Sequence, residues 1–240
     1  MSPPAPLPRI LLVDDNSDNL FLMQLFLGGE PYSVDVALNG REAVDKFRAA
    51  PYDLVFMDLE MPLLDGYGAT RAIRELEQER RAGSPPVPIL VLTAHALDEF
   101  RARCEAAGCT DFLVKPVRKS AVLAAVARYL GQAAAPSQAA PPIAPLAPEI
   151  ELLRPLFPVF FATATGTLDE ARRALDRGDM EGMRRQGHKL KGSALSYGFN
   201  ALGQAALDME RAGEDDDPAA ARTALDRAVA MLDEARKASP

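Results

Sequence analysis

The 240-residue sequence predicts two domains of different class: an α/β domain with a five-stranded, doubly wound parallel sheet, then an all-α bundle. Up to residue 131, short apolar runs alternate with helical patterns, which is typical of a parallel sheet covered by helices on both faces. From residue 149 onward only helical periods remain. Between these regions, residues 132–148 contain seven alanines and five prolines. Because such a segment cannot bury a core, it is predicted to be a linker.

The first domain, residues 1–131, is expected to contain five strands. Several of these runs are apolar without polar alternation, which is the pattern of central parallel strands buried on both faces. The expected strands are Arg9–Val13, Tyr32–Ala37, Asp53–Asp58, Ile89–Leu92 and Asp111–Val114. The intervening helices are expected at residues 17–27, 40–49, 66–81, 98–107 and 119–130, the first of them capped by Asn16 or Ser17.

The second domain, residues 149–240, is expected to be a bundle of the four-helix type, because short connections make neighbouring helices antiparallel. Asp179 and Asn200 are suitable N-caps, and Gly198 is a suitable stop. The expected helices are Glu149–Thr163, Thr165–Arg177, Asp179–Tyr197, Asn200–Ala212 and Pro218–Lys237.

Composition excludes several classes of function. A net charge of −7 gives no sign of a nucleic-acid-binding surface. No apolar run approaches the roughly 20 residues that span a bilayer, and the N-terminus lacks the features of a signal peptide. Cys104 and Cys109, with only two histidines in the chain, are too few ligands for a zinc site and are expected to be thiols. We therefore expect a soluble, cytoplasmic protein with no nucleic-acid or membrane partner.

Four of the five expected strands end beside a polar residue: Asp14 and Asp15, Asp58, Thr93, and Lys115. The carboxyl ends of strands in an open α/β sheet form the crevice where ligands bind. Three clustered carboxylates repel one another, so a divalent cation is the natural neutraliser, and hard oxygen ligands favour Mg²⁺. With a lysine and a hydroxyl, the cluster can hold a phosphoryl group, and a carboxylate there can attack phosphorus. The alternative is an ordinary salt-bridged sheet edge.

From Arg9 to about Gly131 the sequence resembles the receiver domain of two-component response regulators, which has a flavodoxin-like fold. Haloacid-dehalogenase phosphatases also use an aspartyl nucleophile, but theirs follows the first strand in an Asp-x-Asp pattern that is absent here. The residues that carry the resemblance are Val13-Asp14-Asp15-Asn16, Met57-Asp58-Leu59-Glu60-Met61-Pro62-Leu63-Leu64-Asp65-Gly66, Leu92-Thr93-Ala94 and Lys115-Pro116.

This resemblance implies a role for each residue at the sheet edge. Asp58 would be the phosphoacceptor, while Asp14, Asp15, Asp58 and the backbone carbonyl of Glu60 would hold Mg²⁺. Thr93 and Lys115 would bind phosphoryl oxygens. Phe112 matches the aromatic residue that rearranges with Thr93 on activation, and Glu60 and His95 match variable positions that tune the lifetime of the acyl phosphate.

An unusual stretch, Gly187-His188-Lys189-Leu190-Lys191-Gly192-Ser193-Ala194, lies in the second domain. At about 100° per residue, Met183, Gly187, Leu190 and Ala194 share one helix face, the expected core. His188 points about 130° away from that face, on the same side as Lys191 and Arg184. Two glycines inside a helix cost about 1 kcal/mol each. They are expected to leave room for another protein surface to reach the imidazole, which suits a phosphoryl carrier.

The same stretch resembles the histidine phosphotransfer (HPt) domain, which covers about residues 149–237. By this resemblance His188 is the phosphoacceptor and Lys191 assists the transfer. Glu210 matches the position whose side chain orients the imidazole, where family members often carry glutamine.

Together these features predict a phosphorelay protein. Asp58 would accept phosphoryl from a sensor histidine kinase or other phosphohistidine donor, and His188 would carry phosphoryl to or from separate receiver domains that dock around it. Nothing resembles a kinase ATP site, so the expected output is another protein. Two alternatives remain: a phosphate sink that hydrolyses phosphoryl at Asp58, and a docking scaffold without chemistry.

Overall fold

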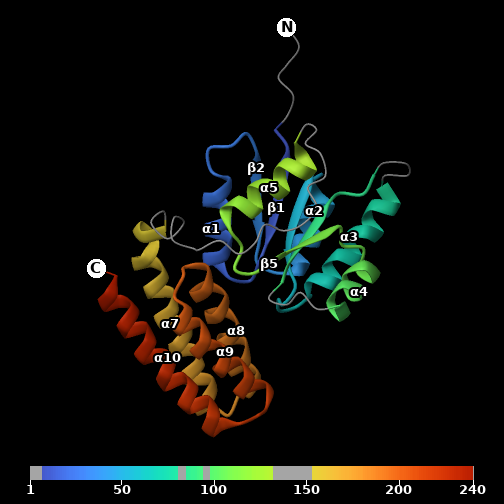
Figure 1. Ribbon diagram of the computed structural model, residues 1–240. Helices are drawn as coiled ribbons and strands as arrows, with labels where there is room; N and C mark the ends of the chain where they lie inside the picture. Colours follow the sequence, from blue (N-terminus) through green and yellow to red (C-terminus); the bar gives the residue numbers. More distant parts are fainter. Residues whose placement is uncertain (1–6, 81–84, 94–97, 132–152, 240) are drawn as a thin grey trace. The chain divides into compact units, whose positions relative to one another are not determined.

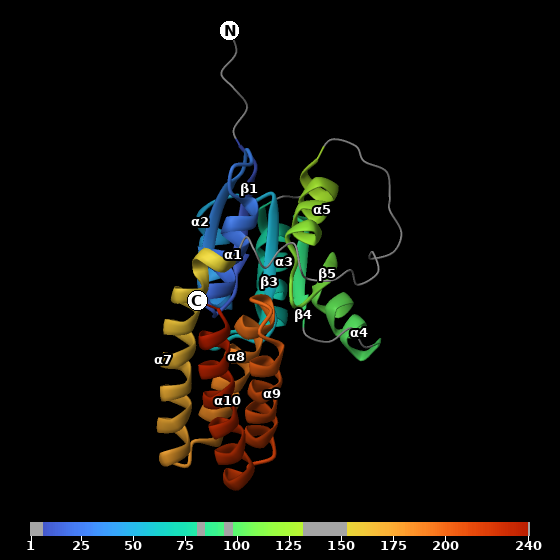
Figure 2. The ribbon, with the colours of Figure 1, turned by 60° about the vertical axis from the view of Figure 1, so that its left-hand side comes forward.

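The computed structural model describes residues 7–80, 85–93, 98–131 and 153–239. The chain divides into two compact units, Met1–Ala139 and Ala140–Pro240, and each is described by itself (Figure 1, Figure 2). The predicted linker, residues 132–148, lies outside the described residues. In the part of the chain that the structure describes, no helix combines the length and the hydropathy needed to cross a bilayer.

The first unit is built on a five-stranded parallel sheet in the order β2-β1-β3-β4-β5. This order confirms the predicted doubly wound, flavodoxin-like fold. The strands are β1 (Arg9–Val13), β2 (Ser33–Ala37), β3 (Leu54–Asp58), β4 (Ile89–Thr93) and β5 (Asp111–Val114). Every residue of β3 and β4 is buried, as expected for central strands, whereas the edge strands β2 and β5 are more exposed.

The described part of this unit also contains five helices: α1 (Ser17–Leu27), α2 (Gly40–Ala49), α3 (Gly66–Arg80), α4 (Asp98–Ala107) and α5 (Lys119–Leu130). α1 packs against α5, whereas α2 packs against α3 and α3 against α4, which gives one helical layer on each face of the sheet (Figure 1). The predicted capping of α1 is confirmed, because the Asn16 side chain accepts a hydrogen bond from the Asp18 N–H. The predicted end of α3 at Arg81 lies outside the described residues.

The second unit is a helical bundle, as predicted. Its described residues, 153–239, form a short 3₁₀ turn, η1 (Arg154–Leu156), and four long helices: α7 (Phe157–Asp176), α8 (Met180–Ser196), α9 (Asn200–Glu214) and α10 (Pro218–Ala238). α8 packs against α7 and α9, and α10 packs against α7 and α9, so the four helices enclose one core. Stacked aromatic rings close one end of that core, where Phe160 lies 4.8 Å from Tyr197 and 4.9 Å from Phe199 between ring centroids.

Two predictions for the bundle are wrong. Residues 157–176 form one helix rather than two separated near Thr165, because buried residues on both sides of Gly166 keep one apolar face continuous. The interior glycine costs about 1 kcal/mol, too little to end a well-packed helix. Asn200 is also not an N-cap: Phe199 occupies that position, without a capping side-chain hydrogen bond, and Asn200 is the first helical residue.

The predicted cap and stop of α8 are confirmed, whereas α9 continues to Glu214, two residues beyond its predicted end, and the predicted helix start at Glu149 lies outside the described residues. Asp179 caps α8 by accepting a hydrogen bond from the Gly182 N–H at 2.7 Å. Gly198 follows α8 with φ +82°, the left-handed conformation that favours glycine at a helix stop.

Candidate functional site

The strand register brings the predicted residues of the first unit to one edge of the sheet. Asp58 is the last residue of β3 and pairs with Leu92, so Thr93 lies one residue beyond it on β4. Asp14 and Asp15 directly follow β1, and Lys115 directly follows β5. Because the strands are parallel, all these positions lie at the carboxyl edge.

Three carboxylates at this edge form a compact cluster. Ligand atoms of Asp14, Asp15 and Asp58 all lie within 4.8 Å of one another. Asp14 and Asp58 are almost fully buried, with 1% and 3% of their surface exposed. Hydrogen bonds hold the Asp14 carboxylate in place, since its Oδ1 accepts the Asn16 N–H at 2.9 Å. Asn19 donates its side-chain amide to both Asp14 oxygens, at 3.1 and 3.2 Å.

Lys115 joins two of these carboxylates. Its Nζ lies 2.8 Å from Asp58 Oδ1 and 3.2 Å from Asp14 Oδ2. Burial alone would lower the pKa of Lys115, but the charges of Asp14 and Asp58 outweigh burial and raise the pKa above its usual value. The ammonium is therefore a fixed positive charge beside the Asp58 carboxylate.

The donor set fits a hard divalent cation. Three clustered carboxylates and one ammonium leave an excess of negative charge in a mostly buried cluster. Carboxylate oxygens with room for water are the ligands that Mg²⁺ prefers. The backbone carbonyl of Glu60 as a further ligand stays a prediction, and the Glu60 side chain is exposed.

The remaining predicted residues of this unit have different outcomes. Thr93 is buried, and its carbonyl accepts the Lys115 N–H at 2.7 Å, which ties the ends of β4 and β5 together. Phe112 is partly buried and packs against the core. His95 lies outside the described residues. The sequence reasoning missed Asn19, although a polar side chain in the first turn of α1, five residues after Asp14, was a usable signal.

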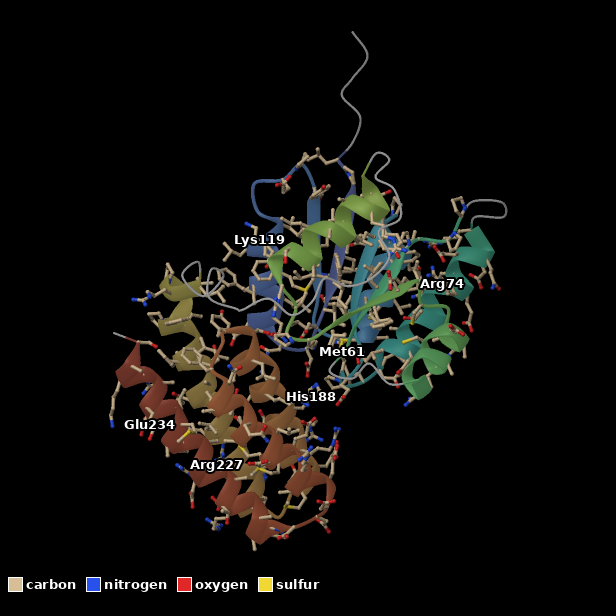
Figure 3. All side chains as sticks on the ribbon, viewed as in Figure 1. Met61, Arg74, Lys119, His188, Arg227 and Glu234 are labelled. Carbon is tan, nitrogen blue, oxygen red and sulfur yellow. The ribbon has the colours of Figure 1, made fainter. Side chains whose placement is uncertain are left out.

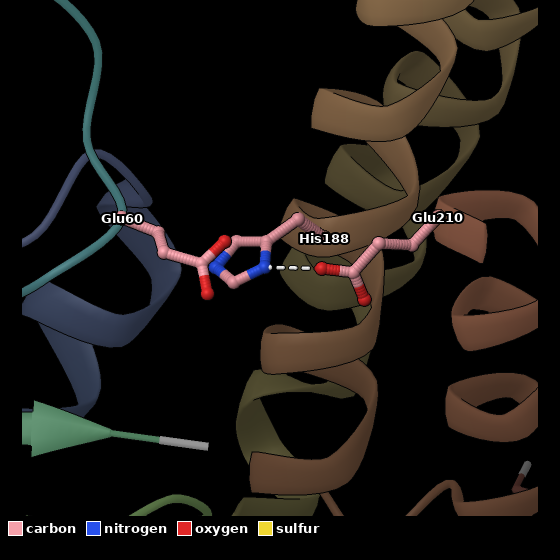
Figure 4. A group of neighbouring side chains, drawn as sticks. All are labelled: Glu60, His188 and Glu210. Carbon is pink, nitrogen blue, oxygen red and sulfur yellow. Dashed lines mark hydrogen bonds and ion pairs between the residues drawn. The ribbon is translucent and has the colours of Figure 1, made fainter. Parts of the chain in front are cut away.

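His188 in the second unit is paired with a carboxylate. It lies on α8 (Figure 3), and its Nδ1 is 2.7 Å from Oε1 of Glu210 on α9 (Figure 4). Lys191 Nζ lies 2.5 Å from the other oxygen of the same carboxylate, so one glutamate joins both predicted residues. Arg184, which was expected on the same side of the helix, forms an ion pair with Glu181. The predicted core face is confirmed, because Met183, Leu190 and Ala194 are fully buried.

Glu210 is a charged group inside the bundle, 5% exposed. Burial alone would raise its pKa, but the hydrogen bonds from His188 and Lys191 outweigh burial and lower the pKa to about 2. The side chain is therefore an anion at neutral pH. A carboxylate against Nδ1 favours the tautomer with its proton on Nδ1, which leaves the lone pair on Nε2.

The prediction that Gly187 leaves room for a partner is wrong. A Cβ atom at Gly187 would lie 2.5 Å from the Glu210 backbone nitrogen and 2.9 Å from the Ala206 carbonyl oxygen. Gly187 thus faces α9 of the same bundle, and its missing side chain is filled by that helix. The corresponding role of Gly192 stays a prediction.

Comparisons with known families agree with both units. Residues 10–127 match the response regulator receiver domain, and residues 156–238 match the Hpt domain. Sensor histidine kinase GacS of Pseudomonas protegens is 40% identical over 129 residues, which are 52% of this chain and 14% of the kinase. Hybrid signal transduction histidine kinase B of Dictyostelium discoideum is 42% identical over 121 residues, 48% of this chain and 6% of that kinase. The chain thus spans a small part of these relatives.

Solved structures resemble this chain over about half its length. One is the receiver domain of sensor histidine kinase PA1611 from Pseudomonas aeruginosa, with a magnesium ion coordinated in its active site cleft. It is 38% identical and covers 52% of this chain and 98% of its own, with a TM-score of 0.46. Another is the complex of Saccharomyces cerevisiae Ypd1 with the receiver domain of Ssk1, which is 32% identical over 52% of this chain and 89% of its own, with a TM-score of 0.49.

Proposed function

This chain combines a response regulator receiver domain with an Hpt domain, and from that premise we propose that it is a phosphorelay protein. The combination fits such a protein and implies histidine kinases and response regulators as partners. Asp58 accepts phosphoryl from a phosphohistidine donor. His188 carries phosphoryl to or from the receiver domain of a partner that docks on the helix face around it.

At Asp58 the proposed reaction is a displacement at phosphorus. One carboxylate oxygen forms the new O–P bond while the N–P bond of the donor phosphohistidine breaks, and the donor imidazole leaves. The observation that carries this proposal is the ammonium of Lys115, 2.8 Å from Asp58 Oδ1. A fixed cation beside the acceptor oxygen can stabilise the charge on the phosphoryl oxygens as it develops. The Thr93 hydroxyl would bind another of these oxygens.

We propose Mg²⁺ as the cofactor of this site. Asp14, Asp15, Asp58 and the backbone carbonyl of Glu60 would hold it. When bound, the ion would neutralise the excess carboxylate charge and offset the phosphoryl charge.

At His188 the nucleophile is Nε2. Glu210 holds the proton on Nδ1, so that the lone pair on Nε2 attacks the acyl phosphate of a partner receiver and the aspartyl oxygen leaves. The negative Glu210 carboxylate also stabilises the positive charge that develops on the imidazole. Lys191 would assist by offsetting charge on the incoming phosphoryl group.

Acetyl phosphate with Mg²⁺ tests the acceptor at the sheet edge. Intact-mass analysis of the full chain should show one added phosphate, lost in Asp58→Asn and lost when a chelator is added. The matched control is Asp45→Asn, an exposed carboxylate paired with Arg48, which should label like the wild type. Continued labelling of Asp58→Asn at another residue of the first unit would contradict the assignment.

A mixing experiment tests His188. The His188→Gln chain, phosphorylated at Asp58, is the donor, and the Asp58→Asn chain is the acceptor. The acceptor should gain an acid-labile, base-stable phosphate, and none when it also carries His188→Gln. Failure of every acyl-phosphorylated receiver to label His188 would refute its role.

The half-life of phospho-Asp58 separates a relay, which needs a long-lived acyl phosphate, from a sink. A cytoplasmic location without nucleic-acid or membrane partners stays a prediction.

A further inference from the structure

Helices α8 and α9 cross closely beside His188, and glycine makes the approach possible on both helices. A Cβ atom at Gly187 of α8 would lie 2.5 Å from the Glu210 backbone nitrogen and 2.9 Å from its Cα. A Cβ atom at Gly213 of α9 would lie 2.6 Å from the Arg184 backbone nitrogen. We call Gly187 and Gly213 the glycine crossing. In both cases the added Cβ would collide with a backbone atom of the other helix, and a backbone atom cannot rotate away as a side chain can.

This crossing determines how far Glu210 lies from His188. Both residues lie at the crossing. His188 directly follows Gly187 in the sequence, and Gly187 contacts the backbone of Glu210. The Glu210 carboxylate meets His188 Nδ1 at 2.7 Å and Lys191 Nζ at 2.5 Å. Contacts of a Cβ atom shorter than 3.0 Å essentially never occur, and ordinary contacts lie at 3.4–4 Å. A methyl group at residue 187 would therefore move α9 away by about 0.5–1 Å. The same displacement would lengthen the 2.7 Å hydrogen bond between Glu210 and His188 to about 3.2–3.7 Å, which weakens or breaks it.

We propose that Gly187 is a positioning residue for phosphoryl transfer: by letting the α9 backbone touch α8, it holds the Glu210 carboxylate against Nδ1 of His188. This deepens the proposed function of the bundle and rests on it. The role of Gly187 is indirect, because it acts only through the distance between Glu210 and the imidazole. Gly213 supports the same distance from the other helix.

A purely structural role for these glycines makes a different prediction. If they served only to stabilise the bundle, any glycine at the same helix pair would be equivalent. Gly203 of α9 provides that comparison, because its Cβ would meet the flexible side chain of Leu195 at 2.6 Å rather than backbone. Gly166 of α7 provides a second comparison, with no atom within 4 Å of an added Cβ.

The test uses the full chain without phosphate, with the imidazole nitrogens observed by ¹⁵N NMR. The chain has only two histidines, His95 and His188, so His188→Gln assigns the signals. The wild type should show the Nδ1–H tautomer at His188, and Glu210→Ala should show the mixture expected for an imidazole without this partner. Gly187→Ala should move the His188 signals toward those of Glu210→Ala. It should also slow phosphoryl transfer to His188 by roughly tenfold or more.

The controls make the proposal falsifiable. Gly203→Ala and Gly166→Ala should retain the wild-type tautomer and transfer rate. If the Gly187→Ala chain does not fold, the same NMR and transfer measurements on Gly213→Ala test the proposal, because this substitution separates the same two helices from the α9 side. A folded Gly187→Ala or Gly213→Ala chain with wild-type imidazole signals would overturn the proposal, as would an equal shift in Gly203→Ala. The NMR measurement requires no phosphoryl transfer. It therefore tests the position of Glu210 against His188 even if His188 proves not to carry phosphoryl.

Discussion

Replacing Glu210 with glutamine should destabilise the helical bundle by an amount that depends on pH. The substitution keeps the size of the side chain but removes the anion that His188 and Lys191 share. Lys191 is 8% exposed, so its ammonium would lose its charged partner inside the bundle. Breaking a buried ion pair by removing one partner typically costs about 3–5 kcal/mol.

The pKa of Glu210 gives a similar magnitude and the sign of the pH dependence. A pKa lowered from 4.5 to about 2 corresponds to about 3 kcal/mol of stabilisation of the folded state. Because the folded pKa is depressed, this stabilisation is fully present above pH 4.5 and is lost as the pH falls toward 2. The difference in unfolding free energy between wild type and Glu210→Gln should therefore be about 3 kcal/mol at pH 7, shrink below about pH 4.5 and vanish near pH 2.

Methionine methyl NMR during urea titration can measure each unit within the full chain. Met183 and Met209 are fully buried in the bundle, and Met57 is fully buried in the first unit. Only the bundle signals should report earlier unfolding in Glu210→Gln. Asp208→Asn is the matched control, because Asp208 also lies on α9 and pairs with Arg227 at 2.8 Å, but at the surface. Exposed pairs contribute about 0.2–1 kcal/mol, so its effect should be small.

Two results would refute this reasoning. Coincident unfolding of Met183 and Met209 in wild type and Glu210→Gln at pH 7 would mean that the carboxylate contributes no net stability. A difference that stays constant from pH 7 to pH 3 would mean that the pKa of Glu210 is not depressed.

Three further predictions concern both units. Mg²⁺ at 100 times its Kd should stabilise the first unit by about 2.7 kcal/mol, measured at Met57, and a chain with Asp15→Asn and Asp58→Asn should lose most of this gain. Gly66→Ala should destabilise the first unit by about 1–3 kcal/mol, because its Cβ would lie 2.1 Å from the Asp58 carbonyl oxygen. Gly28→Ala, with no contact below 3.3 Å, should change stability little in the same titration. Lys191→Met should slow single-turnover transfer to His188 by roughly tenfold, with unchanged phosphorylation of Asp58; an unchanged transfer rate would show that Lys191 has no part in it.

The sequence alone predicted the fold class, the alternation of strands and helices and the edge of the sheet at which Asp14, Asp15, Asp58, Thr93 and Lys115 gather. This was possible because buried parallel strands are continuous apolar runs, and because every strand of a parallel sheet ends at the same edge. The core face of α8 followed equally directly from a helical period of 3.6 residues. These are regularities of local structure, so a single chain segment is enough to show them.

Local sequence patterns were insufficient to predict those features of the bundle that depend on how side chains pack. The sequence was expected to break the helix between Thr163 and Thr165, but the buried face of α7 continues through this region and through Gly166, because burial of several apolar side chains outweighs the cost of one glycine. Asn200 had the chemistry of an N-cap, yet Phe199 takes that position and packs its ring among those of Phe157, Phe160 and Phe161.

Only the tertiary structure decided the electrostatics of the two sites and the role of Gly187. The ammonium of Lys115 reaches two carboxylates that are 57 and 101 residues away in the sequence. Glu210 joins His188 to Lys191 from the neighbouring helix. Gly187 seemed to leave space for a partner because a sequence cannot show which surface fills a missing side chain; in the folded bundle that surface is the backbone of α9. Distances between atoms on different elements depend on how helices and strands pack, and no local sequence pattern contains them.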